Sequence, residues 1–356
     1  MSAARCAADG RLRIGLDGKC LHDRTGGVSR YVDGLLSGLS ALEDVPAVEV
    51  ITPERPTLTV QWVLWHLQRE TRAGWSVFHF PFYYPPLRPH CPVTVAIHDV
   101  LPIEHPEWFP RSWAVVTGTL IRRGARVAAG IVTPSEDSAS RIEAVLGVPR
   151  SRIRVVPHGV DSHLFAPAPA SEVAVARRRY RLDRPYVVLV GPFEARRGVE
   201  LAITALHELR TRNRDLDLVL VGEVRMRFAA LETRPSWVRM VGRVPDADLA
   251  GLCGGAMAFV APSRGEGFDL PVLEALASGA AVVASDIPAH VELFGGAVAT
   301  FASGDAAALA VALDVVIGDD AIRASLRARG LAHARRFDWA TAGRAHVALW
   351  QEVARP

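Results

Sequence analysis

Short apolar runs alternate with longer amphipathic segments along almost the whole chain, and this pattern starts twice. The first series of predicted strands lies at residues 12–18, 47–53, 76–81, 92–99, 129–135 and 151–161. The second series lies at residues 185–193, 216–222, 238–244, 256–263 and 280–285. Strands that alternate with helices form parallel sheets with crossover helices. The sequence therefore predicts an α/β protein with two doubly wound, Rossmann-like domains.

The two series are separated by a polar stretch at residues 166–184 that is rich in proline and arginine. We predict an N-terminal domain at residues 1–165 and a C-terminal domain at residues 166–337, because 356 residues suffice for two cores. We expect an amphipathic helix at about 338–356 to join the first domain. Ligands of open parallel sheets bind beyond the carboxyl ends of strands. We therefore expect function in the loops that follow strands, with the two domains facing a cleft.

Composition excludes several classes of protein. The chain has 41 basic and 38 acidic side chains and a formal charge of +3, which is too even for a nucleic-acid-binding surface. The four cysteines are scattered, so neither a zinc site nor a disulfide framework is predicted. Residues 1–13 lack the apolar stretch of a signal peptide, and the longest apolar runs fall short of the ~20 residues that span a bilayer. We expect a cytoplasmic protein without a membrane-spanning helix.

The segment GEGFDLPVLEAL, which begins at Gly265, directly follows the predicted strand before it. Gly265 and Gly267 permit a sharp turn and a close approach of the backbone to a ligand. Pro271 is tolerated in the first turn of a helix, so the helix should start at Phe268 or Asp269. The N–H groups and dipole of such a helix start favour an anion.

Two carboxylates flank this turn, Glu266 just ahead of the helix and Glu274 inside it. At ~1.5 Å per helical residue they stand on the order of 10 Å apart, a spacing suited to hydroxyls at opposite ends of a diphosphate. A carboxylate accepts paired hydrogen bonds from a vicinal diol, which both a ribose and a hexose offer. The alternative is that Asp269 is an N-cap, Glu266 a surface charge and Glu274 a solvated helix residue.

The stretch from Pro262 to Leu293 resembles the signature of family-4 glycosyltransferases, which are retaining enzymes of the GT-B fold. In that signature two glutamates are separated by seven residues, as Glu266 and Glu274 are here. The resemblance extends over nearly the whole chain, from about Arg13 to Trp350.

A second match is VGPFEARRGVELAITAL, in which Gly191 follows the first strand of the C-terminal half. The resemblance implies that Arg196 and Arg197 hold the donor diphosphate, although the family usually has lysine at the second position. The alternative is two solvent-facing arginines near a helix N-terminus, a place where the helix dipole disfavours cations.

In the first half, IGLDGKCLHDRTGGVSRYVDGLL resembles the strand, glycine loop and helix that open the family's first domain. There Gly26 and Gly27 would let the backbone approach the diphosphate or the acceptor. His98 matches the His-Asp segment found in many members and by resemblance hydrogen-bonds the transferred sugar; a structural histidine is the alternative. His158 replaces the usual asparagine, so no site role is assigned to it.

The resemblance implies a set of roles for the turn after the second half's signature strand. Glu274 would bind the ribose diol, and Glu266 the hydroxyls of the transferred sugar. The remaining donor-binding candidates are Gly267, Phe268, Asp269 and Leu270. Many members carry glycine in place of Asp269, and we expect its side chain to cap the helix and face away from the diphosphate.

No metal or other cofactor is predicted. The Asp-Leu-Asp sequence at residues 215–217 has the form by which another large glycosyltransferase fold holds its metal, but it precedes a predicted strand. We interpret these residues as a turn. Arg196, Arg197 and the helix N-terminus would supply the positive charge that a metal otherwise gives.

The resemblance implies a hexosyltransferase that uses a nucleotide sugar, with GDP-mannose as first candidate and UDP-glucose and dTDP-linked sugars open. The acceptor would be a glycan or lipid-linked glycan of bacterial polysaccharide assembly at the inner membrane face. Aromatic and basic residues could form a peripheral membrane patch or belong to the core: Trp62, Trp65, Trp108, Phe109, Trp113, Arg111, Arg122, Arg123 and Arg126. The rival functions are a GT-B epimerase, a phosphorylase and a non-catalytic nucleotide-binding scaffold.

Overall fold

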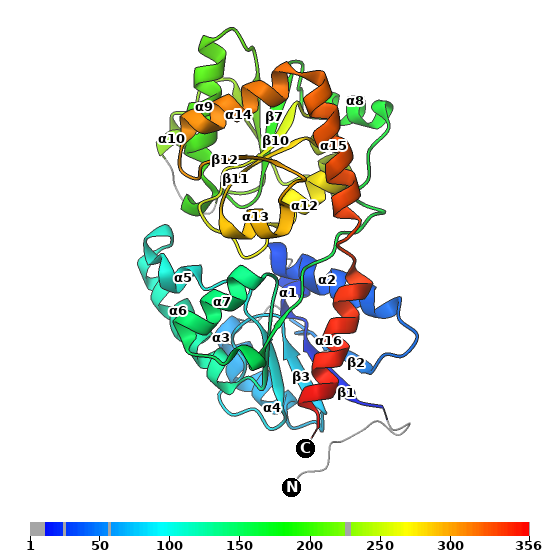
Figure 1. The fold of residues 1–356 in the computed structure, drawn as a ribbon. Coiled ribbons are helices and arrows are strands. Elements are labelled where there is room, and N and C mark those ends of the chain that lie inside the picture. The colour runs from blue at the N-terminus through cyan, green and yellow to red at the C-terminus, as the bar shows by residue number, and fades with distance from the viewer. Residues whose placement is uncertain (1–10, 24–25, 56–57, 225–228, 356) are drawn as a thin grey trace. The chain divides into compact units, whose positions relative to one another are not determined.

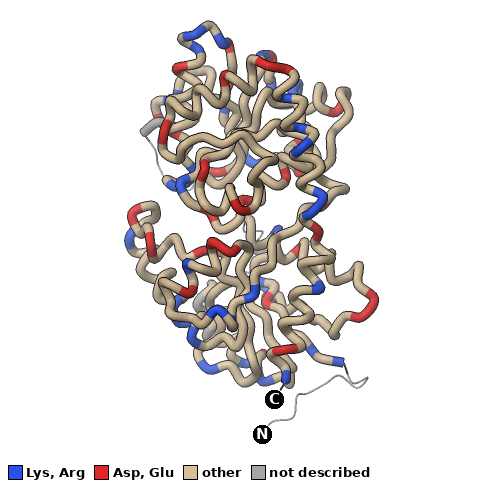
Figure 2. The backbone as a smooth tube through the Cα atoms, viewed as in Figure 1, with Lys and Arg blue, Asp and Glu red and all other residues tan. Residues whose placement is uncertain are grey.

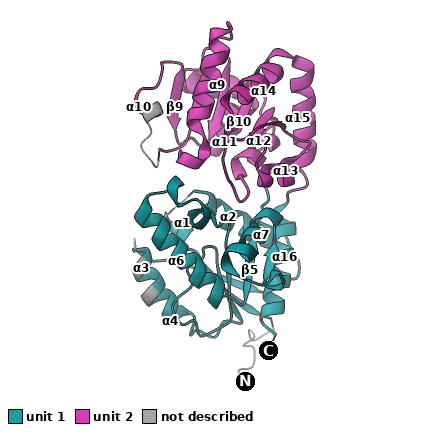
Figure 3. Cartoon of the chain, turned by 60° about the vertical axis from the view of Figure 1, so that its left-hand side comes forward, with its two compact units in different colours: residues 1–159, 338–356 teal, residues 160–337 magenta. Residues whose placement is uncertain are grey.

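The computed structural model describes residues 11–23, 26–55, 58–224 and 229–355. The chain divides into two units, shown in Figure 3: unit 1 runs to Gly159 and resumes at Asp338, and unit 2 is Val160–Phe337. This division falls a few residues before the predicted boundary after residue 165. Basic and acidic residues are interspersed along both units (Figure 2).

Unit 1 contains a six-stranded parallel sheet within the described residues, and helices flank it (Figure 1). In spatial order its strands are β2 (Ala47–Ile51), β1 (Arg13–Asp17), β3 (Val77–Phe80), β4 (Val93–Ala96), β5 (Gly130–Thr133) and β6 (Ile153–Val155). Every residue of β3, β4 and β5 is buried, as expected for a parallel sheet covered on both faces. The predicted strands of the first half are thus confirmed.

The C-terminal helix α16 (Trp339–Val353) packs on α2 (Gly26–Ser40) in unit 1, as predicted. A Cβ atom on Gly38 of α2 would lie 2.0 Å from the carbonyl oxygen of Trp339, so only glycine allows this approach. One face of α2 is apolar and buried, with Tyr31 and Leu35 almost fully covered.

Unit 2 contains a second six-stranded parallel sheet within the described residues. In spatial order its strands are β12 (Ala299–Phe301), β11 (Val282–Ser285), β10 (Ala258–Ala261), β7 (Tyr186–Val190), β8 (Asp217–Val221) and β9 (Val238–Gly242). One core cluster packs α9 (Val199–Thr211) and α14 (Ala306–Gly318) on the sheet. The other packs α11 (Asp246–Gly254), α12 (Leu270–Ala277) and α13 (Pro288–Phe294).

One turn prediction for this half is wrong. Asp217, interpreted as a turn residue, is the first residue of β8 and is buried. Its side chain pairs with Arg184 at 3.8 Å.

Candidate active site

The strand order of unit 2 reverses between the adjacent strands β7 and β10. Chain segments leave these two strands in opposite directions, and ligands of open parallel sheets bind at such a reversal. The loops that follow β7 and β10 carry the predicted site residues of the second half. A hydrogen bond from the Arg264 backbone N–H to the Arg196 carbonyl oxygen (2.8 Å) joins the two loops.

Gly198 lets the loop after β7 pass directly beside the end of β10. Its φ is 62°, and a Cβ atom there would lie 2.2 Å from the Pro262 carbonyl oxygen. Glycine alone satisfies both conditions. The preceding 3-10 turn, η4 (Ala195–Arg197), thereby presents its two arginines to the loop after β10.

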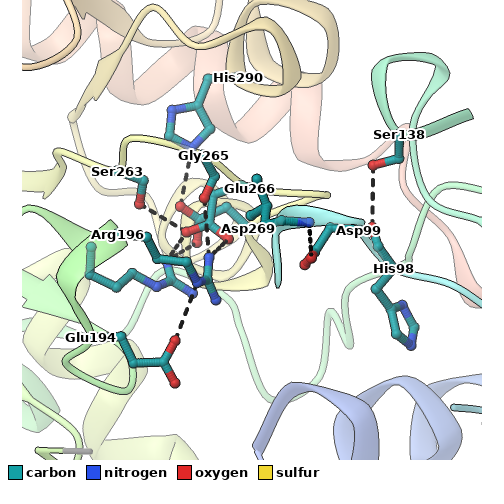
Figure 4. A network of polar contacts seen from close by, with 12 residues as sticks. His98, Asp99, Ser138, Glu194, Arg196, Ser263, Gly265, Glu266, Asp269 and His290 are labelled. Atoms are coloured by element: carbon teal, nitrogen blue, oxygen red, sulfur yellow. Dashed lines mark hydrogen bonds and ion pairs between the residues drawn. The ribbon is translucent and has the colours of Figure 1, made fainter. Parts of the chain in front are cut away.

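Arg196 is held by carboxylate and backbone oxygens from both loops (Figure 4). Its Nε donates to Glu194 Oε2 (3.2 Å), and its Nη1 donates to the Gly265 carbonyl (3.2 Å) and to Glu266 Oε2. The side chain is only 14% exposed, which excludes the alternative of a solvent-facing arginine.

Arg197 is buried more deeply than Arg196, with 7% of the residue exposed. Its Nη1 lies 2.8 Å from Asp269 Oδ1 and 3.0 Å from Glu266 Oε1. Burial alone would lower the pKa of Arg197, but the charges of Asp269 and Glu266 raise it above its ordinary value. The backbone of Gly191, with φ 144°, faces this guanidinium: a Cβ atom there would lie 3.4 Å from Arg197 Nε.

Glu266 is a buried carboxylate and not the surface charge of the alternative interpretation. Its Oε1 accepts a hydrogen bond from the Ser263 hydroxyl (2.9 Å), and both arginines face the same carboxylate. Hydrogen-bond donors thus contact both oxygens of this carboxylate. Sequence reasoning missed Ser263 and Glu194, which complete this arrangement.

The prediction that the Asp269 side chain caps the helix and faces away from the diphosphate is wrong. Asp269 occupies the N-cap position of α12, but its side chain makes no capping hydrogen bond. Its φ of 76° and ψ of 67° are left-handed, whereas a capping aspartate needs an extended backbone. The carboxylate turns inward instead and bridges Arg197 Nη1 and His290 Nε2 (2.8 and 3.1 Å). Despite its burial, these two groups hold the pKa of Asp269 below its ordinary value.

Helix α12 begins at Leu270, one or two residues after the predicted start. Pro271 has no N–H, and the N–H groups of Val272 and Leu273 donate to the Asp269 carbonyl (3.0 and 3.5 Å). The first turn therefore offers fewer donors to an anion than predicted, which leaves the arginines as the main positive charge.

The other donor-binding candidates of this turn are buried. Phe268 packs against Phe294 and Phe337 with ring centroids 5.8 Å away in each case, so its side chain belongs to the core. Leu270 lies in the same core, which leaves only backbone atoms of these residues for a ligand. Glu274 is buried on α12, which excludes a solvated helix residue. The role of Gly267 and of Glu274 toward a donor stays a prediction.

In unit 1, His98 follows β4 and is partly buried. Its Nε2 donates to the Pro81 carbonyl oxygen (3.1 Å), which leaves Nδ1 as a lone-pair acceptor. Burial lowers the pKa of His98 to about 4, so the ring is neutral at pH 7. Gly26 is the first residue of α2, with φ 57°, and Gly27 is exposed, with nothing within 4 Å of an added Cβ atom.

Unit 1 also contains a buried hydrogen-bond chain that sequence reasoning missed. It is centred on Tyr31, whose hydroxyl lies 3.0 Å from His79 Nε2 and 2.7 Å from His346 Nε2. His346 Nδ1 donates to the Ala342 carbonyl (2.8 Å), so its Nε2 accepts the Tyr31 proton. His79 Nε2 then donates to Tyr31, and its Nδ1 accepts from the Thr94 hydroxyl (2.9 Å). All of these hydrogen-bonding groups thus have a partner while both histidines are neutral.

The Tyr31 ring forms part of the wall behind His98. The centroids of the Tyr31 and His98 rings are 5.1 Å apart in an edge arrangement, and the His158 ring lies at the same distance from Tyr31. Burial lowers the pKa of His158 well below its ordinary value. His158 is therefore a neutral packing residue in this unit.

The predicted aromatic patch divides between core and surface. Trp62 is buried and donates to Asp17 Oδ1 (2.8 Å), so it belongs to the core. Trp65 and Trp113 are 75% and 45% exposed. Among the described residues, no helix combines the length with the hydropathy that crossing a bilayer requires.

Two family models match the chain. Residues 41–164 match "Glycosyltransferase Family 4", and residues 184–319 match "Glycosyl transferases group 1". The chain belongs to this glycosyltransferase family. It is 29% identical over 331 residues to O-antigen chain mannosyltransferase B of Escherichia coli, covering 86% of each protein.

Solved structures show the same fold. Sucrose-phosphate synthase from Thermosynechococcus elongatus superposes with a TM-score of 0.74 at 20% identity, covering 96% of this chain and 99% of that one. The Anabaena protein HepE in complex with UDP-glucose gives 0.73 at 18% identity, covering 95% and 98%. The glycosyltransferase thus has the predicted GT-B fold, and the reversal between β7 and β10 is the place to examine for its donor.

Proposed function

We propose that this glycosyltransferase transfers a hexose from a nucleotide sugar with retention of anomeric configuration, and that the diphosphate binds at Arg196 and Arg197. The observation that carries the proposal is the Nε of Arg197, a buried donor with no hydrogen-bond partner in the described part of the chain. An unpaired buried donor costs about 1–3 kcal/mol, and more when charged. A phosphate oxygen is the acceptor that a guanidinium fits best.

The chemistry assigned to these residues follows from where charge develops. As the bond from the anomeric carbon to the phosphate oxygen breaks, negative charge grows on the leaving diphosphate, and the two arginines stabilise it. The acceptor oxygen attacks from the same face, and its proton passes to the departing phosphate. Glu266 would contact the sugar's hydroxyls and stabilise positive charge at the anomeric carbon. Glu274 would bind the ribose diol.

Mannose is the first candidate for the transferred sugar, with GDP-mannose as donor and a glycan or lipid-linked glycan as acceptor. Support comes from the mannosyltransferase that shares 29% identity over most of its length with this chain. A thermal-shift panel of GDP-mannose, UDP-glucose and dTDP-linked sugars distinguishes the donors, since a ligand at 100 times its Kd stabilises by ~2.7 kcal/mol. Stabilisation by another donor alone would exclude GDP-mannose.

Replacement of Arg197 by alanine tests the diphosphate assignment. Loss of a positioned charge of this kind lowers turnover by about 10²–10³-fold. Arg264→Ala is the matched control, because Arg264 lies in the neighbouring loop but its side chain pairs with Glu200 at the surface (2.7 Å). Near-normal turnover in the Arg197 variant would refute the assignment. The anomeric configuration of the product, measured by NMR, tests retention directly.

We also propose that α6 (Arg111–Val127) rests on an anionic membrane surface. Its solvent face carries Trp113, Val115 and Val116, followed by the exposed Arg122 and Arg126, and the helix contains no acidic residue. An apolar face followed by arginines suits a lipid interface. Co-sedimentation with vesicles that contain anionic lipid at low salt should occur and should weaken in Trp113→Ser. No binding at low salt would exclude this role.

A further inference from the structure

His290 on α13 is fully buried, and each of its ring nitrogens faces hydrogen-bond acceptors. Nε2 lies 3.1 Å from Asp269 Oδ2, as Figure 4 shows. Nδ1 lies 3.0 Å from the Ser285 carbonyl oxygen and 3.3 Å from the Ser285 hydroxyl. That hydroxyl donates its own proton to the Ser263 carbonyl (2.5 Å), so toward His290 it also acts as an acceptor.

This set of partners fixes the protonation of His290. A neutral imidazole has one donor and one acceptor nitrogen, whereas both nitrogens donate in the imidazolium. Since both nitrogens of His290 face acceptors, both must carry a proton. The proton between His290 and Asp269 belongs to the imidazole, because the Arg197 charge on the other carboxylate oxygen keeps Asp269 ionised.

The charge of His290 decides the balance at the candidate diphosphate site. Arg196 and Arg197 are matched by three carboxylates in contact with them, those of Glu194, Glu266 and Asp269. Without the imidazolium this group would carry a net negative charge, which opposes an anion. With the imidazolium, the two arginines, the three carboxylates and His290 together carry no net charge. His290 then donates a hydrogen bond to one of the two carboxylate oxygens of Asp269.

We propose that His290 is a positioning residue for the donor diphosphate: as a buried imidazolium it neutralises Asp269 and leaves Arg197 available to a phosphate. The inference rests on the proposed function, because it takes Arg197 as the phosphate ligand. Asp269 is the charged group that faces His290 directly, and Arg197 and Glu266 lie beyond it on the loops after β7 and β10. The polar contacts from β11 come from Ser285 alone among the described residues.

The first measurement uses the wild-type, full-length chain and needs no donor. In a ¹⁵N-histidine NMR spectrum, assigned by comparison with His290→Asn, both His290 nitrogens should be protonated at pH 7. In Asp269→Asn the carboxylate is gone while asparagine tolerates the left-handed backbone, so His290 should lose one proton. A His290 with one unprotonated nitrogen in the wild type would overturn the proposal.

The second measurement is the affinity for GDP, UDP and dTDP by calorimetry. His290→Asn should weaken whichever nucleotide the wild type binds by about tenfold, equivalent to ~1.4 kcal/mol. The wild-type affinity should fall as the pH rises past the midpoint at which NMR shows His290 losing its proton, and His290→Asn should lack this step. His333→Asn is the control. The Nε2 atom of His333 lies 2.6 Å from the Leu293 carbonyl oxygen, so this histidine is bonded away from Asp269.

The outcomes separate the two proposals. If the wild type binds none of GDP, UDP and dTDP, the proposed function fails, while the NMR result still decides the charge of His290. If the wild type binds and His290→Asn binds equally well, the positioning role is wrong and the diphosphate site stands. If His290→Asn does not fold, the wild-type pH profile of nucleotide affinity gives the same decision.

Discussion

Replacing Tyr31 with phenylalanine removes one oxygen atom from the centre of the unit 1 hydrogen-bond chain. Without it, the Nε2 donor of His79 and the Nε2 acceptor of His346 lose their partner, and both rings are fully buried. An unsatisfied buried polar group costs about 1–3 kcal/mol, so two of them should lower the free energy of unfolding of unit 1 by about 2–6 kcal/mol. A domain of this size is stable by only about 5–15 kcal/mol.

Urea unfolding followed by tryptophan fluorescence measures this loss, because all the tryptophans except Trp237 lie in unit 1. Tyr83→Phe is the matched control: it removes the same atom type in unit 1, where the Tyr83 hydroxyl lies near the side chain of Thr117. Thr117 is in α6, and its hydroxyl can turn to a backbone carbonyl of its own helix, so the loss should stay below about 1 kcal/mol. Equal unfolding midpoints for Tyr31→Phe and the wild type would refute the assigned chain of donors and acceptors.

Three further predictions concern acid, backbone strain and metal. Burial lowers the pKa of both His98 and His346 to about 4, whereas an unfolded histidine titrates near 6.5. The unfolded chain therefore binds more protons than the folded chain between these two pH values. The free energy of unfolding of unit 1 should keep its full value above about pH 6.5 and fall toward pH 4, by about 3 kcal/mol per histidine. Urea unfolding midpoints at pH 7.5 and pH 5 check this. Gly198→Ala should destabilise unit 2 by more than about 2 kcal/mol in thermal unfolding, because the added Cβ atom would collide with the Pro262 carbonyl oxygen. Gly147 also has a left-handed backbone but open space around it, so Gly147→Ala should cost about 1 kcal/mol. Turnover should be unchanged by EDTA if the arginines alone carry the leaving-group charge.

The features that could be predicted from the sequence are those that neighbouring residues decide. The apolar runs predicted every strand of the first sheet and all strands of the second except β12, because a strand covered on both faces is continuously apolar. Serine is a favoured N-cap residue, and the Ser135 hydroxyl accepts from the Ser138 N–H (3.1 Å) at the start of α7 (Glu136–Leu146). Glycine commonly ends helices, and Gly147 after α7 adopts the left-handed conformation with φ 65°.

The side chain of Asp269 could not be placed by the same local reasoning. An aspartate just before a helix is usually a cap, but this depends on an extended backbone at that residue. The residue has a left-handed backbone instead, at a position where the resemblance implies that many members of the family carry glycine. That glycine was the available signal, and it indicates a backbone conformation in which the carboxylate points into the protein.

The buried histidines show what local sequence cannot decide, because their charge depends on partners that are distant along the chain. His346 lies next to a backbone carbonyl and the hydroxyl of Tyr31, which is 315 residues away, and one donor and one acceptor keep it neutral. His290 lies between a carbonyl and the carboxylate of Asp269, and two acceptors require it to be charged. The same residue type is therefore a neutral element of stability in unit 1 and a buried cation in unit 2. Exchanging the partner alone should exchange the role: Asp269→Asn, which offers His290 an amide, should convert it to the neutral form without any change to the histidine itself.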